Sequence, residues 1–115
     1  MPNYMLLLYE RPGRMQGLSP DEMQTALEKY MAWMKRPCYR GGARLAHDFG
    51  RVIRIENGKP RVADGPFSET KEVLGGYYMI EAENYDEAVK LALDHPHVEY
   101  NGNVEIRETW GAREM

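Results

Sequence analysis

The stretch GGYYMIEAENYDEAVKLALDHP (Gly75–Pro96) contains the two patterns that decide the fold. It opens with a double glycine and continues into the aromatic and β-branched residues that are typical of a strand. Asn84 is a common helix N-cap, and Glu87, three residues later, completes the signal for the start of a helix. Pro96 ends that helix, because a proline disfavours helical geometry at the residue before it, here His95. The stretch therefore predicts a strand followed directly by a helix.

A similar strand and helix precede this pair in the chain. The apolar run YMLLLYE (Tyr4–Glu10) is typical of a strand that is buried on both faces, so we expect it in the centre of a sheet. In residues 19–36, Ser19 predicts the N-cap, Pro20 the first helical position and Glu22 the third. Apolar residues recur along this helix at helical spacing and predict one buried stripe. The stripe consists of Met23, Ala26, Leu27, Tyr30, Met31 and Met34.

Three further segments complete the secondary structure. Gly41-Gly42 is expected to end the first helical region, and ARLAHDF (Ala43–Phe49) to form a strand. RVIRIENGKPRVADG (Arg51–Gly65) predicts a hairpin with its tight turn at Asn57-Gly58. NVEIRETW (Asn103–Trp110) alternates apolar with polar residues and predicts the last strand.

The resulting order is strand, helix, strand or hairpin, strand, helix, strand. This is the split βαβ arrangement of a ferredoxin-like fold, an α+β sandwich with two main helices on one face of an antiparallel sheet. We expect residues 1–115 to form a single domain, because domains commonly have about 100–150 residues. Nothing in a chain of this length remains to cover the other face of the sheet. We therefore expect a homodimer that forms through the sheet.

The composition is that of an ordinary globular protein, with 43% hydrophobic residues, 29% charged residues and a net charge of −3. The absence of a Lys/Arg-rich run argues against nucleic-acid binding, which needs clustered cations. No apolar stretch resembles a membrane span or a signal peptide. We expect a cytoplasmic protein without a nucleic-acid or membrane partner. Cys38 is the single cysteine, which excludes an internal disulfide and favours a structural role.

Two residues are candidates for general acid–base catalysis. Asp64 is either a turn residue, whose carboxylate accepts backbone N–H bonds, or a catalytic group. His47 lies on the expected strand over residues 43–49, and histidine is the residue type most often used for acid–base chemistry near neutral pH. A contact between His47 and Asp64 across the sheet would form a catalytic pair.

The candidate ligand-binding residues are charged or aromatic. Strand alternation places Arg107 and Glu105 on the sheet face away from the helices. A buried guanidinium needs a planar acceptor, so Arg107 pairs with a carboxylate, that of Glu105 or of Asp64, or with an anionic ligand. Tyr77 and Lys71 complete this set. Lys71 and Glu69 are exposed-looking charges next to Tyr77.

No metal or cofactor is expected. His95 and His97 flank Pro96 in an expected loop and have no third ligand nearby, so we expect them on the surface. The methionines of the first helix are explained by core packing, because flexible thioethers fill irregular gaps.

Several motifs in register with these elements resemble the DGPF branch of the YCII-related proteins. They are DGPF (Asp64–Phe67), KE (Lys71-Glu72), GGYY (Gly75–Tyr78), DEA (Asp86–Ala88) and VEIR (Val104–Arg107). The resemblance covers most of the chain and implies a dimeric α+β barrel related to the ferredoxin-like fold.

The same resemblance bears on function. The wider family includes enzymes that act on lactone products of aromatic breakdown, with a His–Asp pair as the proposed catalytic unit. Here the helix position of that His falls near Tyr30 or Met31, and His95 stands before Pro96 in place of the Asp, so the pair is absent.

Two functions therefore remain open. The first is that of a cofactor-free enzyme acting on a small anionic, aromatic or lactone compound. The second is that of a non-catalytic ligand-binding or accessory protein. Members of the DGPF branch are often encoded beside alternative sigma factors, which makes a regulatory role part of this alternative.

Overall fold

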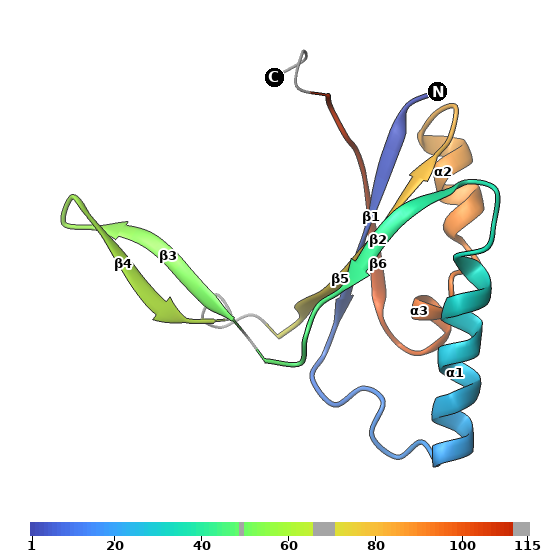
Figure 1. Cartoon of the computed structure of the whole chain (residues 1–115), viewed down its shortest axis with the longest axis horizontal. Coiled ribbons are helices and arrows are strands. Elements are labelled where there is room, and N and C mark those ends of the chain that lie inside the picture. Colours follow the sequence, from blue (N-terminus) through green and yellow to red (C-terminus); the bar gives the residue numbers. More distant parts are fainter. Residues whose placement is uncertain (49, 66–70, 112–115) are drawn as a thin grey trace.

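The structure, a computed structural model, describes residues 1–48, 50–65 and 71–111. A four-stranded antiparallel sheet has the order β2-β5-β1-β6, and a separate two-stranded sheet pairs β3 with β4. The helices lie on one face of the larger sheet (Figure 1), which confirms the predicted α+β class. The elements are β1 (Asn3–Glu10), α1 (Pro20–Trp33), β2 (Tyr39–Arg44), β3 (Arg51–Glu56), β4 (Lys59–Asp64), β5 (Val73–Glu81), α2 (Tyr85–Ala92), α3 (Pro96–Glu99) and β6 (Asn103–Glu108).

Both long helices begin where their capping residues predict. At α1 the Glu22 N–H donates to Ser19 Oγ (3.1 Å), and the Ser19 N–H donates back to the Glu22 carboxylate (2.9 Å). At α2 the Glu87 N–H donates to Asn84 Oδ1 (2.9 Å). These bonds satisfy N–H groups that have no partner inside the helix, and they fix where each helix leaves the sheet.

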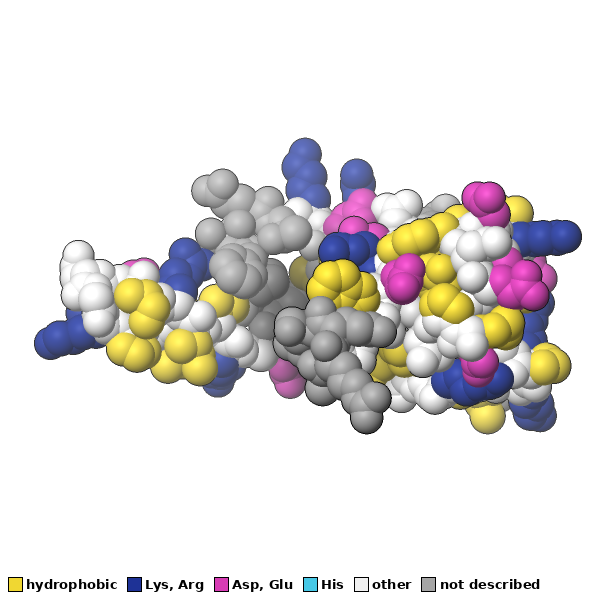
Figure 2. Space-filling model, turned by 90° about the horizontal axis from the view of Figure 1, so that it is seen from above, with side chains coloured by type: hydrophobic (Ala, Val, Ile, Leu, Met, Phe, Trp, Pro, Cys, Tyr) yellow, Lys and Arg dark blue, Asp and Glu magenta, His cyan; other side chains and the backbone are white. Residues whose placement is uncertain are grey.

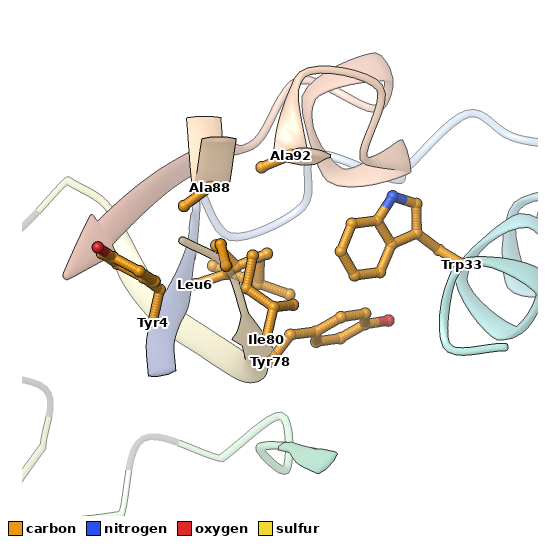
Figure 3. Packing of buried hydrophobic residues seen from close by; sticks show 9 residues of the cluster. Tyr4, Leu6, Trp33, Tyr78, Ile80, Ala88 and Ala92 are labelled. Atoms are coloured by element: carbon orange, nitrogen blue, oxygen red, sulfur yellow. The ribbon is translucent and has the colours of Figure 1, made fainter. Parts of the chain in front are cut away.

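The core lies between the sheet and the helices, with β1 in the interior of the sheet as predicted. Alternate residues of β1 and β5 point toward the helices, and the fully buried residues of α2 are both small, Ala88 and Ala92. The small residues leave room for Trp33, whose ring extends from α1 toward the strands (Figure 3). The buried core residues on the two central strands are Tyr4, Leu6, Leu8, Tyr78 and Ile80.

The stripe predicted on α1 is wrong in part. Ala26 is buried, but Leu27 and Met31 are 40% and 56% exposed. Trp33, which the predicted stripe leaves out, is 3% exposed. The inner face of α1 is therefore rotated toward Trp33, because this large ring removes more apolar surface from water than Leu27 or Met31 would.

The strand predicted over residues 43–49 is also wrong. The strand β2 occupies Tyr39–Arg44 and contains Gly41-Gly42, which were expected to end the helical region. A Cβ at Gly42 would collide with the Tyr77 carbonyl of the neighbouring strand, so the glycine allows a close backbone approach. Of the predicted segment, Phe49 lies outside the described residues.

The β3–β4 hairpin confirms the prediction for residues 51–65. Asn57 and Gly58 have φ angles of 52° and 77°, as a tight hairpin turn requires. The hairpin extends from the side of the four-stranded sheet opposite the helices (Figure 1). It gives the chain a radius of gyration of 16.3 Å, compared with about 13 Å for a compact domain of this length.

The sheet face away from the helices is open. We call it the open face, and its apolar members are Met5, Leu7 and Tyr9 on β1 and Tyr77 and Met79 on β5. All are half-buried by their neighbours within the sheet. No described helix lies over this face (Figure 1), which agrees with the expectation that the chain leaves it uncovered.

Candidate functional site

The two predicted acid–base residues have separate partners. Asp64, the last residue of β4, forms an exposed ion pair with Arg51, whose Nε lies 3.4 Å from its Oδ1. His47 follows β2, and its Nε2 lies 3.2 Å from Arg44 Nη2. The structure therefore does not bring His47 and Asp64 together as the predicted pair.

Three of the predicted ligand-binding residues lie together on the open face. Tyr77 and Glu105 stand on either side of Leu7, one on each neighbouring strand. Arg107 is opposite Met5, and its Nη1 lies 3.9 Å from Glu105 Oε2. The Arg107 side chain is 68% exposed in the single chain. Its ion pair with Glu105 is therefore weak, and most N–H donors of the guanidinium face solvent.

The remaining predicted residues are not part of this group. Lys71 is exposed and precedes β5. Glu69 lies outside the described residues, as do Pro66 and Phe67 of the DGPF motif.

The prediction that His95 and His97 lie on the surface is wrong. Each is only 1% exposed. His95 adopts extended geometry before Pro96, as predicted, but its Nδ1 accepts the His97 N–H (3.0 Å) and so caps the short helix α3. Pro96 therefore begins a new helix as well as ending the previous one, and this turn carries both rings into the core.

His97 lies in a fully bonded network. Its Nε2 is 2.7 Å from the Tyr9 carbonyl, so in the neutral ring Nε2 carries the proton and donates it. Its Nδ1 then accepts from the Tyr30 hydroxyl (2.8 Å). Burial lowers the pKa of His97, and the nearby Arg14 cation lowers it further. Gly102 packs so closely on the ring that a Cβ there would collide with it.

Arg14 joins this network to the rest of the fold. Its guanidinium donates to the Tyr100 carbonyl (2.7 Å) and to the Tyr30 hydroxyl (3.1 Å). Its Nε lies 3.3 Å from the Glu10 carboxylate, an ion pair without the alignment of a hydrogen bond. The Arg14 side chain is only 9% exposed, so these contacts are shielded from water.

His95 differs from His97 because one of its polar atoms is unused. Its Nδ1 accepts the His97 N–H, so in the neutral ring Nε2 carries the proton. Within the described chain this buried Nε2 has no hydrogen-bond partner. The ring is surrounded by those of Tyr78, Trp33 and Tyr30, with centroids 4.6, 4.8 and 5.7 Å away. Burial, followed by the His97 and Arg36 charges, lowers the pKa of His95 to about 4.

A groove of about 550 Å³ between α1 and the α2–α3 segment is lined by His95 and Trp33. Ion pairs stand on its walls: Arg36 Nη2 lies 2.6 Å from Asp94 Oδ2, and Lys29 Nζ lies 2.9 Å from Glu99 Oε2. Hydrogen bonds from Arg36 hold the pKa of Asp94 below its usual value. The groove thus borders two buried rings, those of Trp33 and His95, and carries two exposed ion pairs on its walls.

The profile of the YCII-related domain matches residues 2–112. The chain belongs to the YCII-related family. A solved structure of similar fold is 5-chloro-2-hydroxyhydroquinone dehydrochlorinase (TftG) from Burkholderia phenoliruptrix AC1100, in complex with 2,5-dihydroxybenzoquinone. The likeness has a TM-score of 0.57 and covers 97% of each chain at 13% identity, so it shows the fold alone.

A curated relative of this YCII-related protein is the uncharacterized protein R00369 from Rhizobium meliloti (strain 1021). The two are 46% identical over 43 residues, which are 37% of this chain and 35% of the relative. The matched segment therefore spans only about a third of that relative.

In this YCII-related chain, the positions that the resemblance assigns to a His–Asp pair meet within the buried cluster. Of the two possible positions on α1, Tyr30 contacts the histidines, whereas Met31 is 56% exposed. His95 occupies the second position. The family's positions are thus brought together, but with tyrosine and histidine in place of histidine and aspartate.

Three further features bear on the class of protein and of site. In the described segments, no group of three or more His, Cys, Asp or Glu side chains is placed to hold a metal ion. Among the described helices, none is long and apolar enough to cross a membrane. Cys38 is half-buried, and burial raises the pKa of its thiol, which disfavours the reactive thiolate.

Proposed function

We propose that this protein binds a small aromatic compound with an acceptor oxygen, such as a phenol, a quinone or an aromatic carboxylate, in the groove beside His95. The observation that carries the proposal is the unused Nε2–H of His95. A buried donor without a partner costs about 1–3 kcal/mol. The ring is only 1% exposed, so a ligand oxygen reaches Nε2 only when the rings around it move apart, and it then recovers part of that cost.

The surroundings of His95 combine buried rings with exposed ion pairs. Trp33, which is only 3% exposed, borders the groove, and an anionic group of a ligand would compete with Asp94 and Glu99 for Arg36 and Lys29. A pKa of about 4 keeps His95 neutral at physiological pH. A neutral imidazole donates a hydrogen bond without adding a charge that would need a buried partner.

A second candidate function, cofactor-free catalysis on such compounds, is favoured by the Tyr30–His97 hydrogen bond. The Tyr30 hydroxyl donates to His97 Nδ1 and accepts from Arg14. Burial raises the pKa of this hydroxyl, and the Arg14 cation opposes that effect. The pair is thus an acid and a base in direct contact. The dehydrochlorinase TftG, of similar fold, acts on a small aromatic compound, which supports this substrate class.

The proposed binding predicts that 2,5-dihydroxybenzoate raises the melting temperature of the wild-type protein. At a hundred times its dissociation constant, a ligand stabilises a fold by about 2.7 kcal/mol. The variant His95→Asn should weaken binding at least tenfold, because asparagine can still accept the His97 N–H but has no Nε2–H. Calorimetric titration measures the dissociation constants of the wild type and of the variant.

The matched control for this test is His47→Asn, which changes the exposed histidine that the sequence favours. This variant should bind the aromatic acid as the wild type does. Cyclohexanecarboxylate, which has no aromatic ring, should bind neither the wild type nor His47→Asn. Loss of binding in His47→Asn but not in His95→Asn would move the site to the base of the hairpin and refute the proposal.

We further propose a homodimer that forms through the open face, in the cytoplasm that the composition favours. Half-buried apolar side chains on one sheet face are a liability when exposed to water. Light scattering at micromolar concentration should give twice the chain mass of 13.3 kDa. A mass of 13.3 kDa under these conditions would contradict the dimer.

A further inference from the structure

The hairpin has an apolar face that packs on no described part of its own chain. Register and alternation place Ile53 opposite Val62 and Ile55 opposite Pro60, all on one side. Ile53 is 69% exposed, and Ile55 and Val62 are each 67% exposed. Figure 2 shows hydrophobic side chains gathered along the hairpin, which projects from the body. Such a pattern is typical of strands that bury one face.

The hairpin also lacks support from the four-stranded sheet. Its strands hydrogen-bond to each other and form a sheet of their own. An isolated two-stranded hairpin is only marginally stable in water, and stability requires further strands or a packing partner. A surface that covers Ile53, Ile55 and Val62 is therefore needed to hold the hairpin in this geometry.

The direction of the hairpin identifies a second copy of the chain as the partner. The hairpin lies on the side of the open face, away from the helices (Figure 1). A copy whose sheet packs on the open face would lie on that same side, about 10 Å away. A six-residue strand is about 20 Å long, so the hairpin reaches beyond the partner's sheet.

Charge supports the same partner. Residues 51–64 contain four basic side chains and two acidic ones, a net charge of +2. The whole chain has a net charge of −3, so the remainder carries −5. A basic hairpin against an acidic body is electrostatically favourable between copies of the same chain.

We propose that the hairpin is a clasp that packs Ile53, Ile55 and Val62 against the second subunit of the homodimer. This inference rests on the proposed dimer and adds a second contact area to it. Each subunit contributes one clasp, because a two-fold axis repeats every contact.

The test measures the dimer dissociation constant by analytical ultracentrifugation. The double variant Ile53→Glu/Val62→Glu should raise this constant at least a hundredfold, because it removes apolar contacts at both clasps. Glu56→Gln, on the opposite face of the hairpin, should change it less than threefold. Met79→Glu, on the open face, should give a monomer.

A second measurement locates the contact between the hairpin and the second subunit directly. In dimers mixed from ¹³C-labelled and unlabelled chains, the methyl groups of Ile53, Ile55 and Val62 should show intermolecular nuclear Overhauser effects. A wild-type dimer with an unchanged constant in the double variant, and without these effects, would overturn the clasp and leave the dimer intact. A monomeric wild type would overturn both.

Discussion

Replacing Arg14 with methionine is expected to lower the free energy of unfolding by about 3 kcal/mol. The change removes a shielded guanidinium. This group donates hydrogen bonds to the Tyr100 carbonyl and the Tyr30 hydroxyl and forms an ion pair with the Glu10 carboxylate. Methionine fills a similar volume, so the loss comes from polar groups left without a partner. Urea denaturation monitored by tryptophan fluorescence measures it, since Trp33 lies in the core on which Tyr30 packs.

Arg36→Met is the matched control for this prediction. Its two hydrogen bonds to Asp94 are of similar length, 2.8 and 2.6 Å, but both side chains are more exposed. An exposed ion pair contributes about 0–1 kcal/mol. An equal loss in the two variants would show that the Arg14 network does not stabilise the fold through its burial.

The stability of the wild type is expected to fall by about 3 kcal/mol as the pH drops from 6.5 to 4. Burial lowers the pKa of His95 from 6.5 to about 4 in the folded chain. Between these values the unfolded chain binds a proton that the folded chain does not, so acid favours unfolding. The lowered pKa of His97 adds to the loss in the same direction.

The groups that face His95 show that the fall in stability between pH 6.5 and 4 can be assigned to this histidine. Tyr30, Trp33 and Tyr78 surround it with rings, while Arg36 and His97 disfavour its charge and Asp94 favours it. The contribution of Asp94 is lost only below its ordinary value of 3.8, outside the window. His95→Asn should flatten the slope measured by denaturation at each pH, and His47→Asn should not. A flat wild-type profile would contradict the burial of His95 in the neutral form.

Capping and alternation predict most of the fold because they are local. Ser19 and Asn84 show where the helices begin, and Asn57-Gly58 shows where the hairpin turns. The position of β2 could not be predicted in the same way. Gly41 and Gly42 are breakers by local rules, whereas in the strand Gly41 adopts a φ of 126° and Gly42 allows the close approach of the neighbouring strand.

The buried histidines were missed for a related reason. Polarity and a neighbouring proline place His95 and His97 on the surface by local rules, whereas Tyr30 and Arg14 contact them from distant parts of the chain. One signal was available: a residue before a proline can cap a new helix whose first position is that proline. Applied to His95-Pro96, it predicts the turn that carries both rings inward.

The unused N–H of His95 is the centre of the proposed site, and its ring nitrogens report on it directly. Long-range ¹H–¹⁵N spectra should be recorded while 2,5-dihydroxybenzoate is added. We expect the His95 Nε2 resonance to shift in a saturable way, with the midpoint given by calorimetry, and the His47 resonances to stay in place. Saturable binding that leaves His95 Nε2 unchanged would contradict the account.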